Sequence, residues 1–169
     1  MKRSLLLLPL LLAACGSEEP RQESQDEGQS VVARTAEGEL PGWLTPTDGT
    51  DPARWLAGRE AGRPLADDAP EVAAMRASLR TARTGFVEDP RMMANRTVQL
   101  GQMLAEIGRP EPYRRLIDGL GGIAQMRGRH KSLYGEMVQH YYNARAQGAD
   151  HEAALAQLTT HDIRVTPQP

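Results

Sequence analysis

Hydrophobic residues recur at intervals of three and four along most of the chain after residue 51. Two clear sets are Val72, Met75, Leu79, Ala82 and Phe86, and then Met93, Thr97, Leu100, Leu104 and Ile107. This spacing places the apolar side chains on one face of a helix. No stretch shows the alternation of β-branched and aromatic residues that is typical of strands. We therefore predict an all-α fold, a small bundle of four to six antiparallel helices over residues 52–162.

Acidic residues, prolines and glycines predict where these helices begin and end. Starts are expected at Asp51-Pro52, Asp68-Ala69-Pro70, Asp89-Pro90 and Glu111-Pro112, because an acidic cap followed by proline favours a first helical turn. Stops are expected at Gly108 and Gly148. The spacing of the starts is typical of stacked helical hairpins, but no residue pattern repeats with it. We therefore assign no solenoid repeat.

A third apolar stripe raises a question at Gly128. It runs through Tyr113, Leu116, Leu120, Ile123, Arg127, His130, Tyr134, Met137, Tyr141 and Ala144. If one helix passes through Gly128, Arg127 and His130 face inward, and a polar pocket for a carboxylate or phosphate would use Arg127, Arg129, His130 and Tyr134. If the helix ends at Gly128, the basic side chains lie in a solvated turn. We favour the turn, because glycine weakens helix interiors and unpaired buried charge is costly.

A strongly acidic stretch precedes the predicted helices. Between Ser17 and Asp51 the sequence holds nine acidic residues, two arginines and few large apolar residues. This composition predicts a solvated, disordered tether over residues 15–51. From Pro52 onward there are 16 basic and 13 acidic residues, so the predicted helical domain is mildly basic. Residues 163–169 are predicted to form a tail.

Leu40-Pro41-Gly42-Trp43-Leu44-Thr45-Pro46 interrupts the acidic stretch with two large apolar side chains, Trp43 and Leu44. The prolines favour an extended path. This segment either docks on a partner through Trp43 and Leu44 or folds back on its own domain. We favour the second interpretation, because a tryptophan left in water is uncommon.

The first sixteen residues have the layout of a secretory signal peptide. Lys2 and Arg3 precede an apolar run, and small residues precede the single cysteine, Cys15. The run is too short to cross a bilayer as a helix. The sequence Leu12-Ala13-Ala14-Cys15-Gly16 resembles the lipobox of bacterial lipoproteins, which makes residues 1–14 the signal peptide.

The lipobox resemblance implies that Cys15 carries diacylglycerol and an N-acyl chain such as palmitate. Several acyl chains make such an anchor durable. Because Gly16 is not an aspartate, the resemblance also implies the outer membrane, facing the periplasm of the cell envelope. With Cys15 acylated, the chain has no other thiol for a disulfide, metal site or nucleophile.

The remaining motifs do not indicate a cofactor or a resident metal. Gly119 to Ala124 has the letters of a dinucleotide loop, but a helical pattern precedes it where a strand is required. Glu136 and His140 share one helical face, and Asp150-His151 follows the next turn. We interpret Glu136 and His140 as an ordinary intrahelical pair and expect no bound metal.

Catalysis is not predicted, because no nucleophile or acid–base motif is present. A peptidoglycan-cleaving enzyme would need a helix-borne glutamate, for which Glu106, Glu111 and Glu136 qualify by residue type, but a sugar cleft needs more aromatic residues than the seven here. We expect a non-enzymatic lipoprotein that binds a protein of an envelope assembly. The alternatives are a module for an anionic small or polymeric ligand and, third, peptidoglycan cleavage. A nucleic-acid partner is not expected outside the cytoplasm.

Overall fold

Six α-helices make up the part of the chain that the structure describes. The computed structural model describes residues 40–128 and 130–163, the last three by their backbone alone. The helices are α1 (Pro52–Ala61), α2 (Pro70–Arg83), α3 (Pro90–Glu106), α4 (Tyr113–Met126), α5 (Tyr134–Ala146) and α6 (His151–Ile163). These ranges contain no strand, so the predicted small all-α bundle is confirmed.

The predicted helix starts are correct to within a residue or two, but only two of the four acids act as caps. Asp51 accepts a hydrogen bond from the backbone N of Ala53 at 3.1 Å, and Asp89 accepts one from the backbone N of Met92 at 2.9 Å. The N-cap of α2 is Ala69 rather than Asp68, since Pro70 imposes the extended conformation on the residue directly before it. The N-cap of α4 is Pro112, and Glu111 has another role.

Helix α4 ends at Met126, and Gly128 follows with a φ of +82°, in the left-handed region that favours glycine. The alternative of one continuous helix through Gly128 is therefore wrong, and the turn is confirmed. Gly108 and Gly148, after α3 and α5, also have positive φ, as expected of helix stops.

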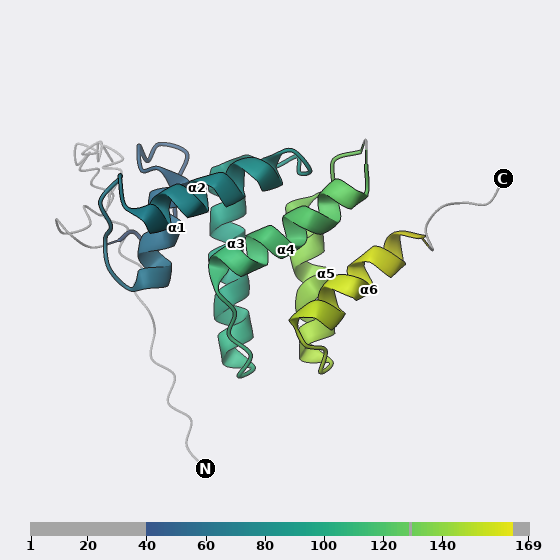
Figure 1. The fold of residues 1–169 in the computed structure, drawn as a ribbon. Helices are drawn as coiled ribbons and strands as arrows, with labels where there is room; N and C mark the ends of the chain where they lie inside the picture. The colour runs from purple at the N-terminus through teal and green to yellow at the C-terminus, as the bar shows by residue number, and fades with distance from the viewer. Residues whose placement is uncertain (1–39, 129, 164–169) are drawn as a thin grey trace, which may run out of the picture. The chain divides into compact units, whose positions relative to one another are not determined.

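The helices pack in two rows. Helices α1, α3 and α5 contact one another in order, and α2, α4 and α6 do the same, while each hairpin also packs on itself. Figure 1 shows α3 and α5 side by side, with α4 crossing in front of them. This is an arrangement of stacked helical hairpins, of which the spacing of helix starts is typical although no residue pattern repeats with it.

One hydrophobic core runs through all six helices, and its largest fully buried side chains include Trp55, Tyr134, Tyr141 and Phe86. The rings of Phe86 and Tyr134 pack edge to face, with their centroids 4.9 Å apart. Within the described residues, no helix combines the length and the apolar character that crossing a bilayer requires.

The loop between α2 and α3 pairs with the loop between α4 and α5. The backbone N of Val87 donates to the Ser132 carbonyl at 3.1 Å, and the Ser132 N donates to the Gly85 carbonyl at 2.9 Å. Next to this bridge, the Glu88 carboxylate accepts the backbone N–H groups of Tyr134 and Gly135. Glu88 thus supplies the N-terminal cap of α5, since the N-cap residue itself makes no side-chain bond.

Candidate functional site

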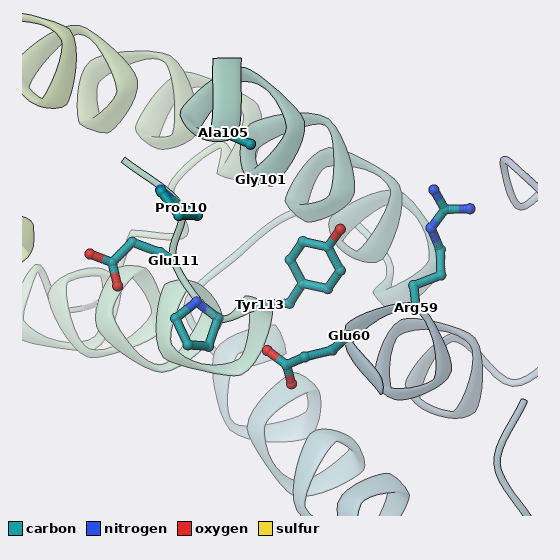
Figure 2. Close-up of a pocket in the computed structure, with 8 residues that line it drawn as sticks. Arg59, Glu60, Gly101, Ala105, Pro110, Glu111 and Tyr113 are labelled. Atoms are coloured by element: carbon teal, nitrogen blue, oxygen red, sulfur yellow. The ribbon is translucent and has the colours of Figure 1, made fainter. Parts of the chain in front are cut away.

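An open groove of about 690 Å³ lies where the first turn of α4 meets α3 and the end of α1 (Figure 2). Its lining is mostly apolar, with a few charged side chains, as is typical of ligand sites. The lining residues are Arg59 and Glu60 of α1, Gly101 and Ala105 of α3, Pro110, Glu111 and Pro112 of the α3–α4 loop, and Tyr113 of α4.

The Tyr113 ring packs directly against the backbone of α3. A Cβ atom added at Gly101 would lie 3.1 Å from Tyr113 Cδ1 and closer still to Cε1, so only glycine leaves room for this ring. Figure 2 shows the ring between Gly101 and Glu60. Because Tyr113 is only partly buried, the groove presents an aromatic surface in a fixed position.

The two charged side chains of α1 at the groove have different surroundings. The Arg59 guanidinium donates to the Pro41 carbonyl at 3.2 Å and lies over the Trp55 ring. Glu60 is exposed, and its carboxylate accepts a bond of 3.4 Å from the backbone N of Arg114. Glu60 therefore gives this rim of the groove a solvent-exposed negative charge.

Glu111 connects the groove to a buried ion pair. Its carboxylate lies 2.6 Å from the Arg145 guanidinium, and the two side chains are only 10% and 6% exposed. The other Glu111 oxygen accepts from Arg115 at 3.3 Å. Arg145 also donates to the Arg109 carbonyl, while Arg109 donates to the Ala149 carbonyl. These contacts tie the α3–α4 loop to α5 and to the start of α6.

Tyr141 extends this network to His151. The Arg145 guanidinium donates to the Tyr141 hydroxyl at 3.2 Å, and that hydroxyl lies 2.8 Å from His151 Nδ1. Burial raises the pKa of Tyr141 to about 12, so the hydroxyl keeps its proton. Burial, followed by the nearby Arg115 charge, lowers the pKa of His151. The imidazole is therefore favoured in its neutral form, in contact with a protonated hydroxyl.

A second groove of about 600 Å³ shares Glu60 and Pro112 with the first. His151 lines it but is 95% buried, so the imidazole forms part of its wall rather than a projecting group. Its other lining residues are Glu60, Arg114, Arg115, Asp118, Gly119, Glu152 and Leu155. The groove contains both acidic and basic side chains, and Arg115 contacts both Glu111 and Glu152. This groove is therefore of mixed charge.

The basic residues predicted for a ligand pocket do not come together around Tyr134. Tyr134 is fully buried, and its hydroxyl lies 2.7 Å from the Thr97 hydroxyl. Burial raises the Tyr134 pKa above that of a solvated tyrosine. Arg127 donates to the Leu158 carbonyl at 3.1 Å, His130 is exposed, and Arg129 lies outside the described residues. The described members of the set thus occupy three different environments.

The segment before α1 folds back on the domain through Leu44. This side chain is fully buried, and the Asn95 amide group exchanges two hydrogen bonds, of 3.0 and 2.9 Å, with the Leu44 backbone. The Trp55 indole N–H donates to the Pro41 carbonyl. Leu44 is consequently unavailable to a partner in this conformation, whereas Trp43 is 50% exposed. Cys15 and the rest of residues 1–39 lie outside the described residues.

The carboxylates and histidines weighed for catalysis or metal binding are dispersed. Glu136 and His140 lie 3.8 Å apart on α5 as an exposed pair. The described residues contain no group of three or more side chains suited to holding a metal ion. Glu111 faces Arg145, and Glu106 and Glu136 are exposed on α3 and α5. These three glutamates do not share a cleft.

The glycines of the dinucleotide-like sequence lie within helix α4 and permit close helix packing. A Cβ atom at Gly121 would lie 3.0 Å from the Ala82 Cβ and 3.2 Å from its Cα, on α2. A Cβ at Gly119 would lie 2.8 Å from a Leu155 methyl carbon on α6, whereas one at Gly122 would meet open space. With no strand before them, these glycines serve α2–α4 and α4–α6 packing rather than a phosphate loop.

The comparison with known protein families now identifies the kind of domain. The MoxZ family model matches residues 53–162, which cover the groove and nearly all of the six helices. The chain belongs to the MoxZ family. Protein MoxZ of Paracoccus denitrificans is 31% identical to it over 148 residues, which are 87% of this chain and 83% of that protein. No solved structure matches the chain.

Sequence patterns missed the polar cluster of Glu111, Arg145, Tyr141 and His151 in this MoxZ-family domain. Arg145 lies four residues after Tyr141, so it shares a helical face with this buried residue near the end of α5. A charged residue at such a position signals a buried partner. Its partner, Glu111, is 34 residues away in the sequence, and only the fold brings the two together.

Proposed function

We propose that this MoxZ-family chain is a non-enzymatic lipoprotein of the bacterial envelope, whose helical domain binds a partner protein in the groove at Tyr113. Acyl chains on Cys15 would hold the protein at the outer membrane facing the periplasm, and residues 16–39 would give the domain reach. The lipobox resemblance supports the anchor. The groove supports the binding function.

The observation that carries the binding proposal is the Tyr113 ring held against Gly101 and open to a ligand. Aromatic side chains of this kind are frequent in interface hot spots, because they bury much area with little loss of side-chain entropy. A rigid backbone support reduces the ordering cost of binding further. The groove therefore suits an inserted apolar side chain.

The exposed Glu60 carboxylate adds a charge preference to this groove. Glu111, on the other wall, is already neutralised by Arg145 and Arg115, and Arg59 is engaged by Pro41 and Trp55. Among these three side chains, Glu60 is the most exposed charge that a ligand would meet. We expect the partner segment to carry an apolar residue next to a lysine or arginine.

Affinity capture with the full-length chain tests this proposal. The chain is expressed in its own host, solubilised from membranes in mild detergent and recovered with its bound proteins. Tyr113→Ser should remove the specifically enriched partner, and Glu60→Lys should reduce it, since the first deletes the aromatic surface and the second reverses the rim charge.

The matched control is Tyr142→Ser, on α5, because Tyr142 is another partly buried tyrosine that packs at the edge of the core. Circular dichroism of each variant verifies that the helices persist. A partner retained equally by Tyr113→Ser and Tyr142→Ser would show that the groove is not the binding site.

A further inference from the structure

The paired loops at the end of α2 and α4 hold apolar side chains in solvent. The parallel bridge between Phe86 and Ser132 places the next residues, Val87 and Leu133, beside each other. Val87 is 55% exposed, Leu133 is 52% exposed, and Met126, at the end of α4, is 67% exposed. Figure 1 shows both loops at one end of the helices.

Hydrogen bonds and close packing fix the backbone of these two loops. Arg83 donates to the Phe86 carbonyl at 3.1 Å, and the Glu88 carboxylate accepts two backbone N–H groups at the start of α5. A Cβ atom at Gly85 would lie 2.8 Å from the Ala124 Cβ, so the loop rests closely on α4. The exposed apolar side chains are therefore held outward by a well-bonded backbone.

The chain segments that form this end have no acidic residue. Neither residues 72–87 nor residues 119–135 contain an aspartate or a glutamate, although the whole chain has a net charge of −2. Arg80, His130 and Lys131 are exposed here, and Arg83 and Arg127 are partly exposed. Of the acids that border these segments, Glu88 is bonded to the α5 backbone and Asp89 lies 3.6 Å from Arg91, while Glu136 is exposed in the first turn of α5. This end of the domain is thus distinctly basic.

We propose that this surface, which we name the basic tip (Arg80, Arg83, Val87, Met126, Lys131 and Leu133), docks on an anionic phospholipid membrane. Basic side chains are attracted to the negative surface of such a membrane, and neighbouring apolar side chains enter the headgroup region. A soluble polyanion would attract the charges but leave the apolar side chains in water. The combination of the two favours lipid as the occupant.

This inference rests on the proposed location at the envelope membrane, and it adds an orientation to it. The basic tip lies at the C-terminal end of α4, and the Tyr113 groove lies at its N-terminal end. A helix of 14 residues spans ~20 Å, at 1.5 Å per residue. Docking through the tip would therefore leave the groove clear of the membrane surface and open to a partner.

Vesicle binding tests the proposal with a chain that cannot be acylated. The probe is the mature-length chain, residues 15–169 with Cys15→Ser, mixed with vesicles of phosphatidylglycerol and phosphatidylcholine or of phosphatidylcholine alone. Co-sedimentation should show binding to the anionic vesicles only. Two double variants should each lose at least about tenfold in affinity for the anionic vesicles. They are Val87→Ser/Leu133→Ser and Arg80→Glu/Lys131→Glu.

Two controls make the result specific to the tip. Arg114→Glu changes charge at the opposite end of α4, and Trp43→Ser removes an exposed apolar side chain before α1; both should bind as the parent chain does. Equal binding to neutral vesicles, or equal loss with the control variants, would overturn the proposal. So would binding to soluble polyglutamate as strong as that to anionic vesicles. None of these assays involves the groove or the acyl chains, so their failure is distinguishable from failure of the proposed function.

Discussion

Glu111 and Arg145 form an ion pair of 2.6 Å that is almost completely shielded from solvent. The pair joins the loop that precedes α4 to the last turn of α5, and through Tyr141 it reaches the first residue of α6. The α3–α4 loop, α5 and α6 of the MoxZ-family domain are therefore linked through one carboxylate. That same residue lines the Tyr113 groove, so the network supports the wall of the proposed binding site.

Removing one partner of this pair should destabilise the fold. Glu111→Ala leaves the Arg145 charge buried without its carboxylate, and the free energy of unfolding should fall by about 3 kcal/mol. Urea denaturation followed by circular dichroism measures the change. Glu106→Ala is the control, because Glu106 is exposed and its loss should change the free energy by less than about 0.5 kcal/mol. Equal effects of the two substitutions would refute the structural role of the pair.

Two adjacent glycines of α4 should respond in opposite directions to alanine. Gly121→Ala places a methyl group 3.2 Å from the backbone of α2, which must shift, so the free energy of unfolding should fall by about 1–3 kcal/mol. Gly122→Ala meets open space within the same helix and should raise stability by up to about 1 kcal/mol. Thermal and urea unfolding of both variants measure this. A Gly121→Ala protein as stable as Gly122→Ala would contradict the close approach of α2 and α4.

The lowered pKa of His151 predicts a dependence of stability on pH. The imidazole protonates near pH 6.5 in the unfolded chain but only at lower pH in the folded one, so the contribution to stability is complete above about pH 6.5 and decreases as the pH falls below it. The free energy of unfolding should therefore decline from about pH 7.5 to about pH 5, and more steeply in the parent chain than in His151→Asn.

The control for this pH effect is His140→Asn, which removes an exposed histidine from the surface of α5. The comparison shows whether a loss of slope in His151→Asn is specific to the buried histidine. If the free energy of unfolding depends on pH in the same way in His151→Asn and in the parent chain, the buried Tyr141–His151 contact does not cause the pH dependence.

The proposed lipid anchor predicts that acylation depends on Cys15 alone. Cys15→Ala should abolish labelling by radioactive palmitate and leave an unprocessed precursor of higher apparent mass. The chain has no other cysteine, so no second thiol can take the diacylglycerol. Labelling that survives in Cys15→Ala would rule out the lipobox interpretation.

The sequence predicted the helices well, because their signals are local. The prolines at 52, 70 and 90 occupy the first helical turn as expected, and the apolar stripes of α2 and α3 are buried. The site was predicted poorly, since its key contacts join residues far apart in the sequence. Glu88 caps a helix 46 residues later, and Tyr113 meets α3 only after the chain reverses. No local pattern distinguishes these two residues from an ordinary surface glutamate or core tyrosine.

At Gly128 the local pattern left two alternatives open, a pocket at Tyr134 and a turn, and the fold decides for the turn that we favoured. Arg127, His130 and Tyr134 share a helical spacing, but the helix stops at Met126 and the three side chains separate. The basic character of this region persists as a surface property. Its companions are the exposed Val87 and Leu133 rather than the buried Tyr134 hydroxyl.

Site-specific crosslinking tests the central claim, that the groove at Tyr113 receives a protein partner. A photoreactive benzoylphenylalanine is placed at Ala105, on the α3 side of the groove, or at Gln139, an exposed position on α5. Irradiation of living cells should join the residue 105 variant to one discrete protein, and addition of Tyr113→Ser should remove that product. The residue 139 variant should give none. Absence of a product from position 105, or the same product from both positions, would contradict the account.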